Sequence, residues 1–118
     1  MEIHGGRAEA IGQLSEMGIK NETFVLGVNE LVAVLKMLEE NGYGEMVQAD
    51  MKIVRGLDYY TGTVFEFILP EYRHVGSVCG GGRYENLAGY FTDQKLPGVG
   101  GSIGLTRLFY VLAENNLL

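Results

Sequence analysis

The sequence predicts an α+β fold in which helices flank a mainly antiparallel sheet. Apolar residues recur at helical spacing in the first third of the chain and again at its end. Between these segments, from residue 47 to residue 104, apolar residues alternate with polar ones or run continuously. Helices gathered at the two ends of a block of strands are typical of antiparallel α+β architectures rather than of βαβ repeats.

Two helices are expected in the first third of the chain. Residues 7–17 carry apolar side chains three positions apart, and Gly18 follows them as a stop signal. A second helix is expected to begin after Asn29, a residue type that caps helix N-termini well, and to end before Gly42.

Four strands are expected between these helices and the end of the chain. Residues 47–53 alternate between apolar and polar types, which is typical of a half-buried antiparallel strand. Residues 63–69 are apolar at nearly every position, which predicts a central strand covered on both faces. Two glycine-containing strands are expected at residues 75–80 and 99–104, and the second leads into a helix beginning near Leu105.

Composition favours one globular domain. A chain of 118 residues with 47% hydrophobic content is long enough for one domain and too short for two ordinary ones. No apolar run approaches the ~20 residues of a membrane-spanning helix, and the first residues lack the apolar core of a signal peptide. The single Cys79 cannot form a disulfide within the chain, which favours a reducing compartment. We therefore expect a cytoplasmic protein with no membrane partner.

The net charge excludes a broad nucleic-acid-binding surface. Nine Lys and Arg against fifteen Asp and Glu give a formal net charge of −6. Extensive contact with a phosphate backbone needs an electropositive footprint, so most contacts to any nucleic-acid partner must come from elsewhere. Metal binding is not expected either, because His4 and His74 have no carboxylate or thiol at ligand spacing.

An arginine and two tyrosines interrupt the β-like stretch KIVRGLDYYTGTVFEFILP. If the alternation continues, Arg55 follows Ile53 toward the interior, where a guanidinium must be paired. It either forms a salt bridge with Asp58 or another acid of the chain, or binds a carboxylate or phosphate ligand. Tyr59 and Tyr60 either fill the core or line one pocket at a point where the backbone turns.

Glycines form two further unusual stretches. In CGGGRYENL, Gly80, Gly81 and Gly82 expose bare backbone, which suits either a β-bulge or wide turn, or a planar ring or chain segment lying against them. In PGVGGSIGLTRL, a strand of small residues runs into a helix whose first turn carries Arg107. That arginine either binds an anion at the helix N-terminus or lies on the surface of tight strand–helix packing. Glu66, between phenylalanines, is expected to pair with an arginine that the sequence alone does not identify.

Together, VRGLDYYTGTVFE, CGGGRY and PGVGGSIGLTRL resemble the catalytic domain of the histidyl-tRNA synthetases, a family of class II aminoacyl-tRNA synthetases. The first stretch is similar to the family's histidine-specific motif, and the last to class II motif 3. The resemblance is close over residues 47–113 and loose before them. It implies a helical segment at residues 1–45 that leads in from an insertion region, and the C-terminal part of the catalytic core at residues 46–118.

The resemblance also implies roles for individual residues. Arg55 would contact the histidine carboxylate and the α-phosphate of ATP during catalysis. The two tyrosines after it and Tyr84 would line the histidine pocket. Arg107, with Gly104, would bind ATP, the arginine reaching the γ-phosphate or stacking on adenine. Gly80, Gly81 and Gly82 would form the floor of the histidine pocket, where bulkier side chains would collide with substrate. The histidine-binding residues implied by the resemblance thus include Tyr59 and Tyr60 as well as the three glycines.

For the whole protein, the resemblance implies activation of L-histidine with ATP and transfer of the product to tRNA(His), by a homodimer. Mg²⁺ would arrive with ATP, and no metal site is expected in this chain. Motif 1, motif 2 and the anticodon-binding domain are not found in this sequence, so the chain is expected to be a fragment that is inactive, or nearly so, by itself. The tRNA contacts would lie mainly elsewhere. An alternative relative is the histidine-sensing, synthetase-like regulatory subunit of ATP phosphoribosyltransferase, which shares the fold.

Overall fold

The computed structural model describes residues 7–55 and 60–118, and the chain divides into two compact units between Val54 and Arg55. The structure contains helices as well as a three-stranded antiparallel sheet, which confirms the α+β prediction. None of the helices in the described residues is long and apolar enough to cross a membrane.

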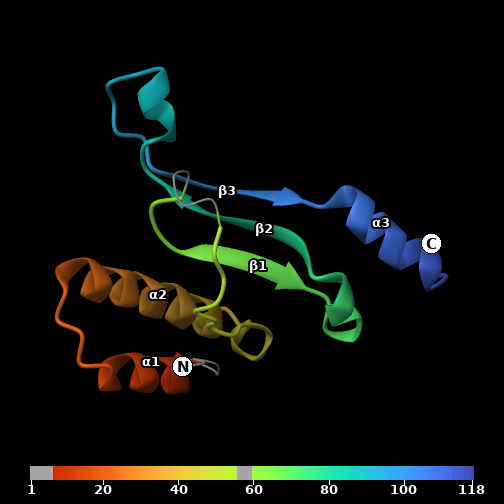
Figure 1. Cartoon of the computed structure of the whole chain (residues 1–118), viewed down its shortest axis with the longest axis horizontal. Helices are drawn as coiled ribbons and strands as arrows, with labels where there is room; N and C mark the ends of the chain where they lie inside the picture. The colour runs from red at the N-terminus through yellow and green to blue at the C-terminus, as the bar shows by residue number, and fades with distance from the viewer. Residues whose placement is uncertain (1–6, 56–59) are drawn as a thin grey trace. The chain divides into compact units, whose positions relative to one another are not determined.

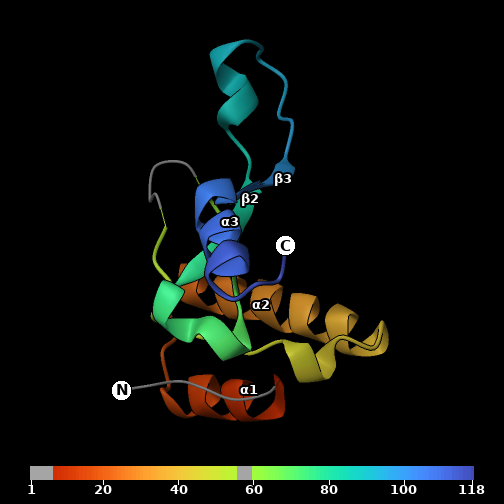
Figure 2. The same cartoon turned by 90° about the vertical axis from the view of Figure 1, so that its right-hand side faces the viewer.

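The first unit is a helical pair, α1 (Arg7–Glu16) and α2 (Glu22–Glu40), lying side by side and antiparallel (Figures 1 and 2). Its core joins Leu14 of α1 and Leu35 of α2 to Ala49, and each of the three is at most 6% exposed. The predicted helix at residues 7–17 is confirmed, and Gly18 follows it with a φ of +61°, a left-handed conformation that favours glycine at helix ends.

The second helix begins at Glu22, so the predicted start after Asn29 was wrong. Asn21 is the N-cap, and its side-chain oxygen accepts a hydrogen bond from the backbone N–H of Phe24 at 3.1 Å. Asn29 lies on the exposed face of the helix interior. Such a residue is tolerated because Phe24, Val28 and other apolar side chains of α2 pack against the core, and packing outweighs helix propensity.

Replacing the cap tests this boundary. Asn21→Ala should lower the free energy of unfolding by about 1 kcal/mol, because an N–H at the helix start loses its acceptor. The matched variant Asn29→Ala should leave stability unchanged or raise it slightly, since alanine is the better helix former. Urea unfolding followed by far-UV circular dichroism measures both. A larger loss for Asn29→Ala than for Asn21→Ala would place the helix start at the later residue.

Residues 47–53 were expected to form a strand, and the structure corrects this. After the short 3₁₀ helix η1 (Gly44–Met46) they form no β-ladder. The Asp50 carboxylate accepts a hydrogen bond from the N–H of Lys52 at 2.9 Å, and its carbonyl accepts one from Ile53. Aspartate makes such local turns readily. A strand also needs a pairing partner, whereas the three strands of the described sheet pair only with one another.

The second unit is built on the sheet β1–β2–β3, in that order (Figure 1). β2 (Ser77–Tyr84) is the central strand and pairs antiparallel with both β1 (Val64–Ile68) and β3 (Gly98–Ile103). The strand expected at residues 63–69 therefore exists, but it is an edge strand, and Phe67 is 59% exposed. An apolar run cannot by itself tell how many neighbours a strand has.

Short helices connect and extend this sheet. The 3₁₀ helix η2 (Pro70–Val75) joins β1 to β2, and η3 (Leu87–Tyr90) lies in the connection from β2 to β3, which extends beyond the sheet in Figures 1 and 2. The helix α3 (Leu105–Glu114) follows β3, as predicted. Among the described residues of the second unit, the buried apolar side chains are Val78 of β2 and Val111 of α3, 7% and 1% exposed.

Candidate active site

One face of the sheet collects most of the predicted site residues. Side chains alternate between the two faces along a strand, and residues directly opposite on neighbouring strands share a face. Gly80 of β2 is opposite Glu66 on β1, and Tyr84 is opposite Gly98 on β3. We call this the site face; its members are Val64, Glu66, Gly80, Gly82, Tyr84, Gly98, Gly100 and Ser102.

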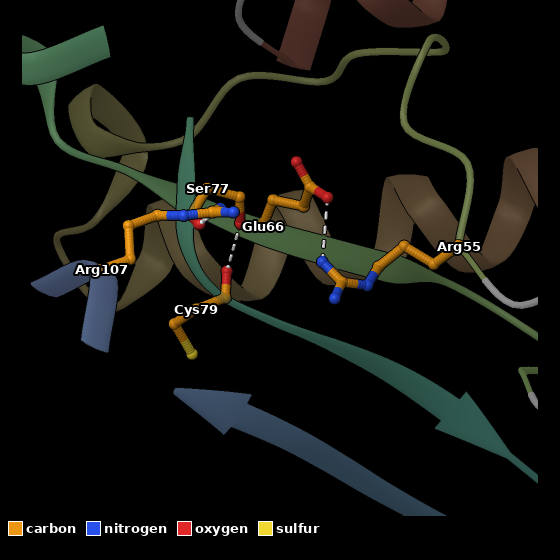
Figure 3. A network of polar contacts seen from close by, with 5 residues as sticks. All are labelled: Arg55, Glu66, Ser77, Cys79 and Arg107. Carbon is orange, nitrogen blue, oxygen red and sulfur yellow. Dashed lines mark hydrogen bonds and ion pairs between the residues drawn. The ribbon is translucent and has the colours of Figure 1, made fainter. Parts of the chain in front are cut away.

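Arg55 lies against the site face, where it forms an ion pair with Glu66 (Figure 3). Its Nη1 is 2.9 Å from Oε1 of Glu66, and the two side chains are 26% and 25% exposed. A Cβ added to Gly80 would overlap Nη1 of Arg55 and lie 2.6 Å from its Cζ. The guanidinium thus rests on bare backbone. The expected acidic partner exists and is Glu66, while Asp58 lies outside the described residues.

The Tyr60 side chain lies against Gly82, the next glycine of β2 on the same face. It is half-buried, and a Cβ added to Gly82 would lie 2.8 Å from its Cδ1. The residue after it is fixed to β2, because the N–H of Thr61 donates a hydrogen bond to the carbonyl of Arg83 at 2.9 Å. The chain therefore delivers Tyr60 to the sheet just before β1 begins. Tyr59 lies outside the described residues.

The Tyr84 ring lies over glycines of β3. A Cβ added to Gly98 would be 2.7–2.9 Å from three ring and hydroxyl atoms of Tyr84, and one added to Gly100 would be 3.3 Å from Cε1. Arg55, Tyr60 and Tyr84 therefore share one arrangement, in which a planar group lies against backbone that has no side chain. Gly80 and Gly82 are buried, so the planar side chains rather than the glycine backbone would meet a ligand on this face.

Gly81 differs from its two neighbours, because its position alternates to the opposite face. A Cβ there would overlap the carbonyl oxygen of Gly100, and it would lie 2.6 Å from Cα of Gly101 and 2.8 Å from Cζ of Phe65. The glycine triplet continues β2 in register, so the bulge or wide-turn alternative was wrong. The contacts that an added Cβ would make at all three positions are with the chain itself.

Arg107 lies at the other end of β2. It is in the first turn of α3 and donates a hydrogen bond from Nη1 to the backbone carbonyl of Ser77 (Figure 3). Gly104, just before the helix, donates its N–H to the carbonyl of Val78 at 2.8 Å. These two contacts attach the start of α3 to the start of β2. The two arginines therefore have different partners, Glu66 for Arg55 and the Ser77 carbonyl for Arg107.

Sequence reasoning missed three participants. Ser77 was not anticipated as the acceptor for Arg107, and Gly98 and Gly100 were not anticipated as the residues against which the Tyr84 ring packs. The repeated glycines of PGVGG did indicate that a ring could pack against this strand. Glu66 was noticed, and a charged residue within an apolar strand does require a partner, but sequence spacing could not decide which arginine it was.

The described residues contain no group of three or more His, Cys, Asp or Glu side chains that could hold a metal ion. The charged groups on the site face are the Arg55 guanidinium and the Glu66 carboxylate, which pair with each other.

Comparison with known proteins identifies the family. The family model for histidyl-tRNA synthetase matches residues 2–108. The chain belongs to the histidyl-tRNA synthetase family. Among curated members, the histidine–tRNA ligases of Finegoldia magna and Clostridium tetani are 52% and 50% identical to the chain across its whole length.

Family membership extends to solved structures. The crystal structure of histidyl-tRNA synthetase from Nostoc sp. PCC 7120 is 42% identical and superimposes with a TM-score of 0.85 over 97% of the chain. The chain spans only 28% and 27% of the two curated synthetases and 27% of the Nostoc synthetase. It corresponds to about a quarter of a family member.

Proposed function

We propose that this chain is the part of a histidine–tRNA ligase that holds L-histidine and the phosphates of ATP. The observation that carries the proposal is the site face, where Arg55, Tyr60 and Tyr84 lie against glycine backbone on one side of a small sheet. Family membership supports the choice of ligand. The helical segment at residues 1–45 then leads into the catalytic core at residues 46–118.

In this proposal Arg55 binds the histidine carboxylate and the α-phosphate. A guanidinium has five N–H donors in a planar fork that matches carboxylate and phosphate oxygens. The contact with Glu66 uses Nη1, which leaves other donors of the fork for the ligand. A fixed cation aimed at the transferring group stabilises charge that develops in the transition state, without reorganisation of solvent.

Tyr60, Tyr84 and Tyr59 supply the walls of the histidine pocket, where a phenol can hydrogen-bond an imidazole nitrogen. Of the three glycines expected to form the floor of the pocket, Gly80 and Gly82 lie on the site face, whereas Gly81 supports the floor from the opposite face by letting β2 and β3 pair closely. Gly80 and Gly82 act chiefly by making room for Arg55 and Tyr60, because those are the groups that an added Cβ would meet.

Arg107 and Gly104 bind ATP in this proposal. Arg107 would exchange the Ser77 carbonyl for the γ-phosphate, or stack on adenine, when ATP binds. Mg²⁺ enters with ATP, where it neutralises phosphate charge.

The parent protein performs two steps in this proposal. A carboxylate oxygen of histidine attacks the α-phosphorus of ATP, the bond to the bridging oxygen breaks, and pyrophosphate leaves with its electrons. A ribose hydroxyl at the end of tRNA(His) then attacks the carbonyl carbon of the adenylate, loses its proton, and AMP leaves. The parent acts as a homodimer, with most tRNA contacts outside the part of the family represented here.

The isolated chain should bind L-histidine but catalyse little or no adenylation. Positioning of two substrates contributes ~7–11 kcal/mol to such reactions, and a chain covering about a quarter of a family member supplies part of it. Calorimetric titration with L-histidine and an ATP–pyrophosphate exchange assay test both halves. Robust exchange by the chain alone would contradict the fragment proposal, and absence of histidine binding would contradict the assignment of the site face.

The same titration addresses the histidine-sensing alternative. A regulatory subunit of ATP phosphoribosyltransferase would bind histidine with no effect of ATP. In the ligase proposal, ATP and histidine share Arg55, so ATP with Mg²⁺ should change the measured histidine affinity. An affinity that is identical with and without ATP would favour the sensor.

A further inference from the structure

We infer that Glu66 is the positioning residue for Arg55. Its carboxylate, together with the bare backbone of Gly80, holds the guanidinium in the orientation in which it meets an anionic ligand. The inference rests on the proposed function for the identity of that ligand, L-histidine. The orientation of Arg55 itself does not depend on that function.

The contacts enclose the guanidinium on two sides. Glu66 reaches it from β1, and Gly80 lies against it on β2, directly opposite Glu66 in the sheet register. Figure 3 shows the two side chains pointing toward each other. The ion pair uses Nη1 of Arg55, and the other N–H groups of the guanidinium are the donors that would meet a carboxylate or phosphate.

Arginine needs such support because its long side chain has many rotamers. A free arginine must be ordered when the ligand binds, and that entropy cost lowers the affinity. The ion pair with Glu66 links the Arg55 side chain to β1. A half-buried, charge-assisted contact of 2.9 Å orders the guanidinium before the ligand arrives.

A competing interpretation makes the opposite prediction. If Glu66 merely neutralises Arg55 until an anion displaces it, removing the negative charge should strengthen histidine binding. If Glu66 positions Arg55, removing the charge should weaken binding. The sign of the change in affinity for Glu66→Gln thus separates the two. Glutamine keeps nearly the same shape, so the packing of β1 is little disturbed.

The first measurement observes Arg55 directly, without ligand. In ¹⁵N-labelled chain at low temperature, the side-chain N–H resonances of Arg55 should be resolved, because the ion pair slows rotation of the guanidinium. In Glu66→Gln they should average or exchange with water. The matched control is Glu85→Gln, which breaks an ion pair of similar length, 2.8 Å to Arg83, at a more exposed position. That control should leave the Arg55 resonances unchanged.

The second measurement compares two ligands. L-histidine carries the carboxylate that Arg55 would bind, and L-histidinamide lacks it. Glu66→Gln should weaken L-histidine binding roughly tenfold while changing histidinamide binding by less than about twofold. A general loss of structure would weaken both equally, so the ratio of the two affinities isolates the role of Arg55.

Identical Arg55 resonances in wild type and Glu66→Gln would overturn the inference, as would tighter binding of L-histidine by the variant. If the wild-type chain shows resolved, Glu66-dependent Arg55 resonances but binds no L-histidine, the positioning role stands and the proposed function fails. The two failures are therefore distinguishable.

Discussion

Arg55→Ala is expected to weaken L-histidine binding roughly a hundredfold, about 3 kcal/mol. The substitution removes the cation that lies on Gly80 and faces the proposed carboxylate site. It also leaves Glu66 half-buried without its 2.9 Å partner, and that negative charge repels an incoming carboxylate. Calorimetric titration of both chains with L-histidine measures the loss.

Two variants separate the role of Arg55 from loss of charge in general. Arg55→Lys keeps the charge but loses the planar fork, so we expect an intermediate loss of roughly tenfold. Arg83→Ala removes a cation from the neighbouring ion pair with Glu85, and it should leave histidine affinity within about twofold. Equal losses for Arg55→Ala and Arg83→Ala would show that only net charge matters, and the assignment of Arg55 would then be wrong.

Gly81→Ala should be the most destabilising single-methyl addition among the triplet, lowering the free energy of unfolding by about 3 kcal/mol. The new Cβ would overlap the carbonyl oxygen of Gly100 and crowd Cα of Gly101. Both are backbone atoms of the paired strand β3, so relief requires the strands to separate rather than one side chain to rotate. Urea unfolding followed by tyrosine fluorescence measures the change.

Gly80→Ala and Gly89→Ala provide the matched comparison. At Gly80 the new Cβ meets the end of the flexible Arg55 side chain, which can move away, so stability should fall by only about 1 kcal/mol while histidine affinity falls as in Arg55→Ala. At Gly89 nothing lies within 4 Å of the new Cβ, and neither quantity should change appreciably. If Gly81→Ala were as stable as Gly89→Ala, the tight contact between β2 and β3 would be refuted.

Local signals in the sequence identified most elements correctly. The helix at residues 7–17, the glycine-rich strand before α3 and α3 itself follow from periodicity and stop residues, which act over a few neighbours. The start of α2 and the supposed strand at residues 47–53 were wrong for a common reason. Caps and turns formed by Asn21 and Asp50 depend on single side-chain hydrogen bonds, which periodicity does not record.

By itself, the sequence determined the family. Three motifs in the expected order indicate the histidyl-tRNA synthetase family, and the family model matches residues 2–108. The tertiary structure alone decided that Glu66 is the partner of Arg55, that β2 is the central strand, and that bare glycine backbone accommodates Arg55, Tyr60 and Tyr84. The physical reason is that strand register brings together residues distant in sequence, and a shift of one residue would move each to the other face.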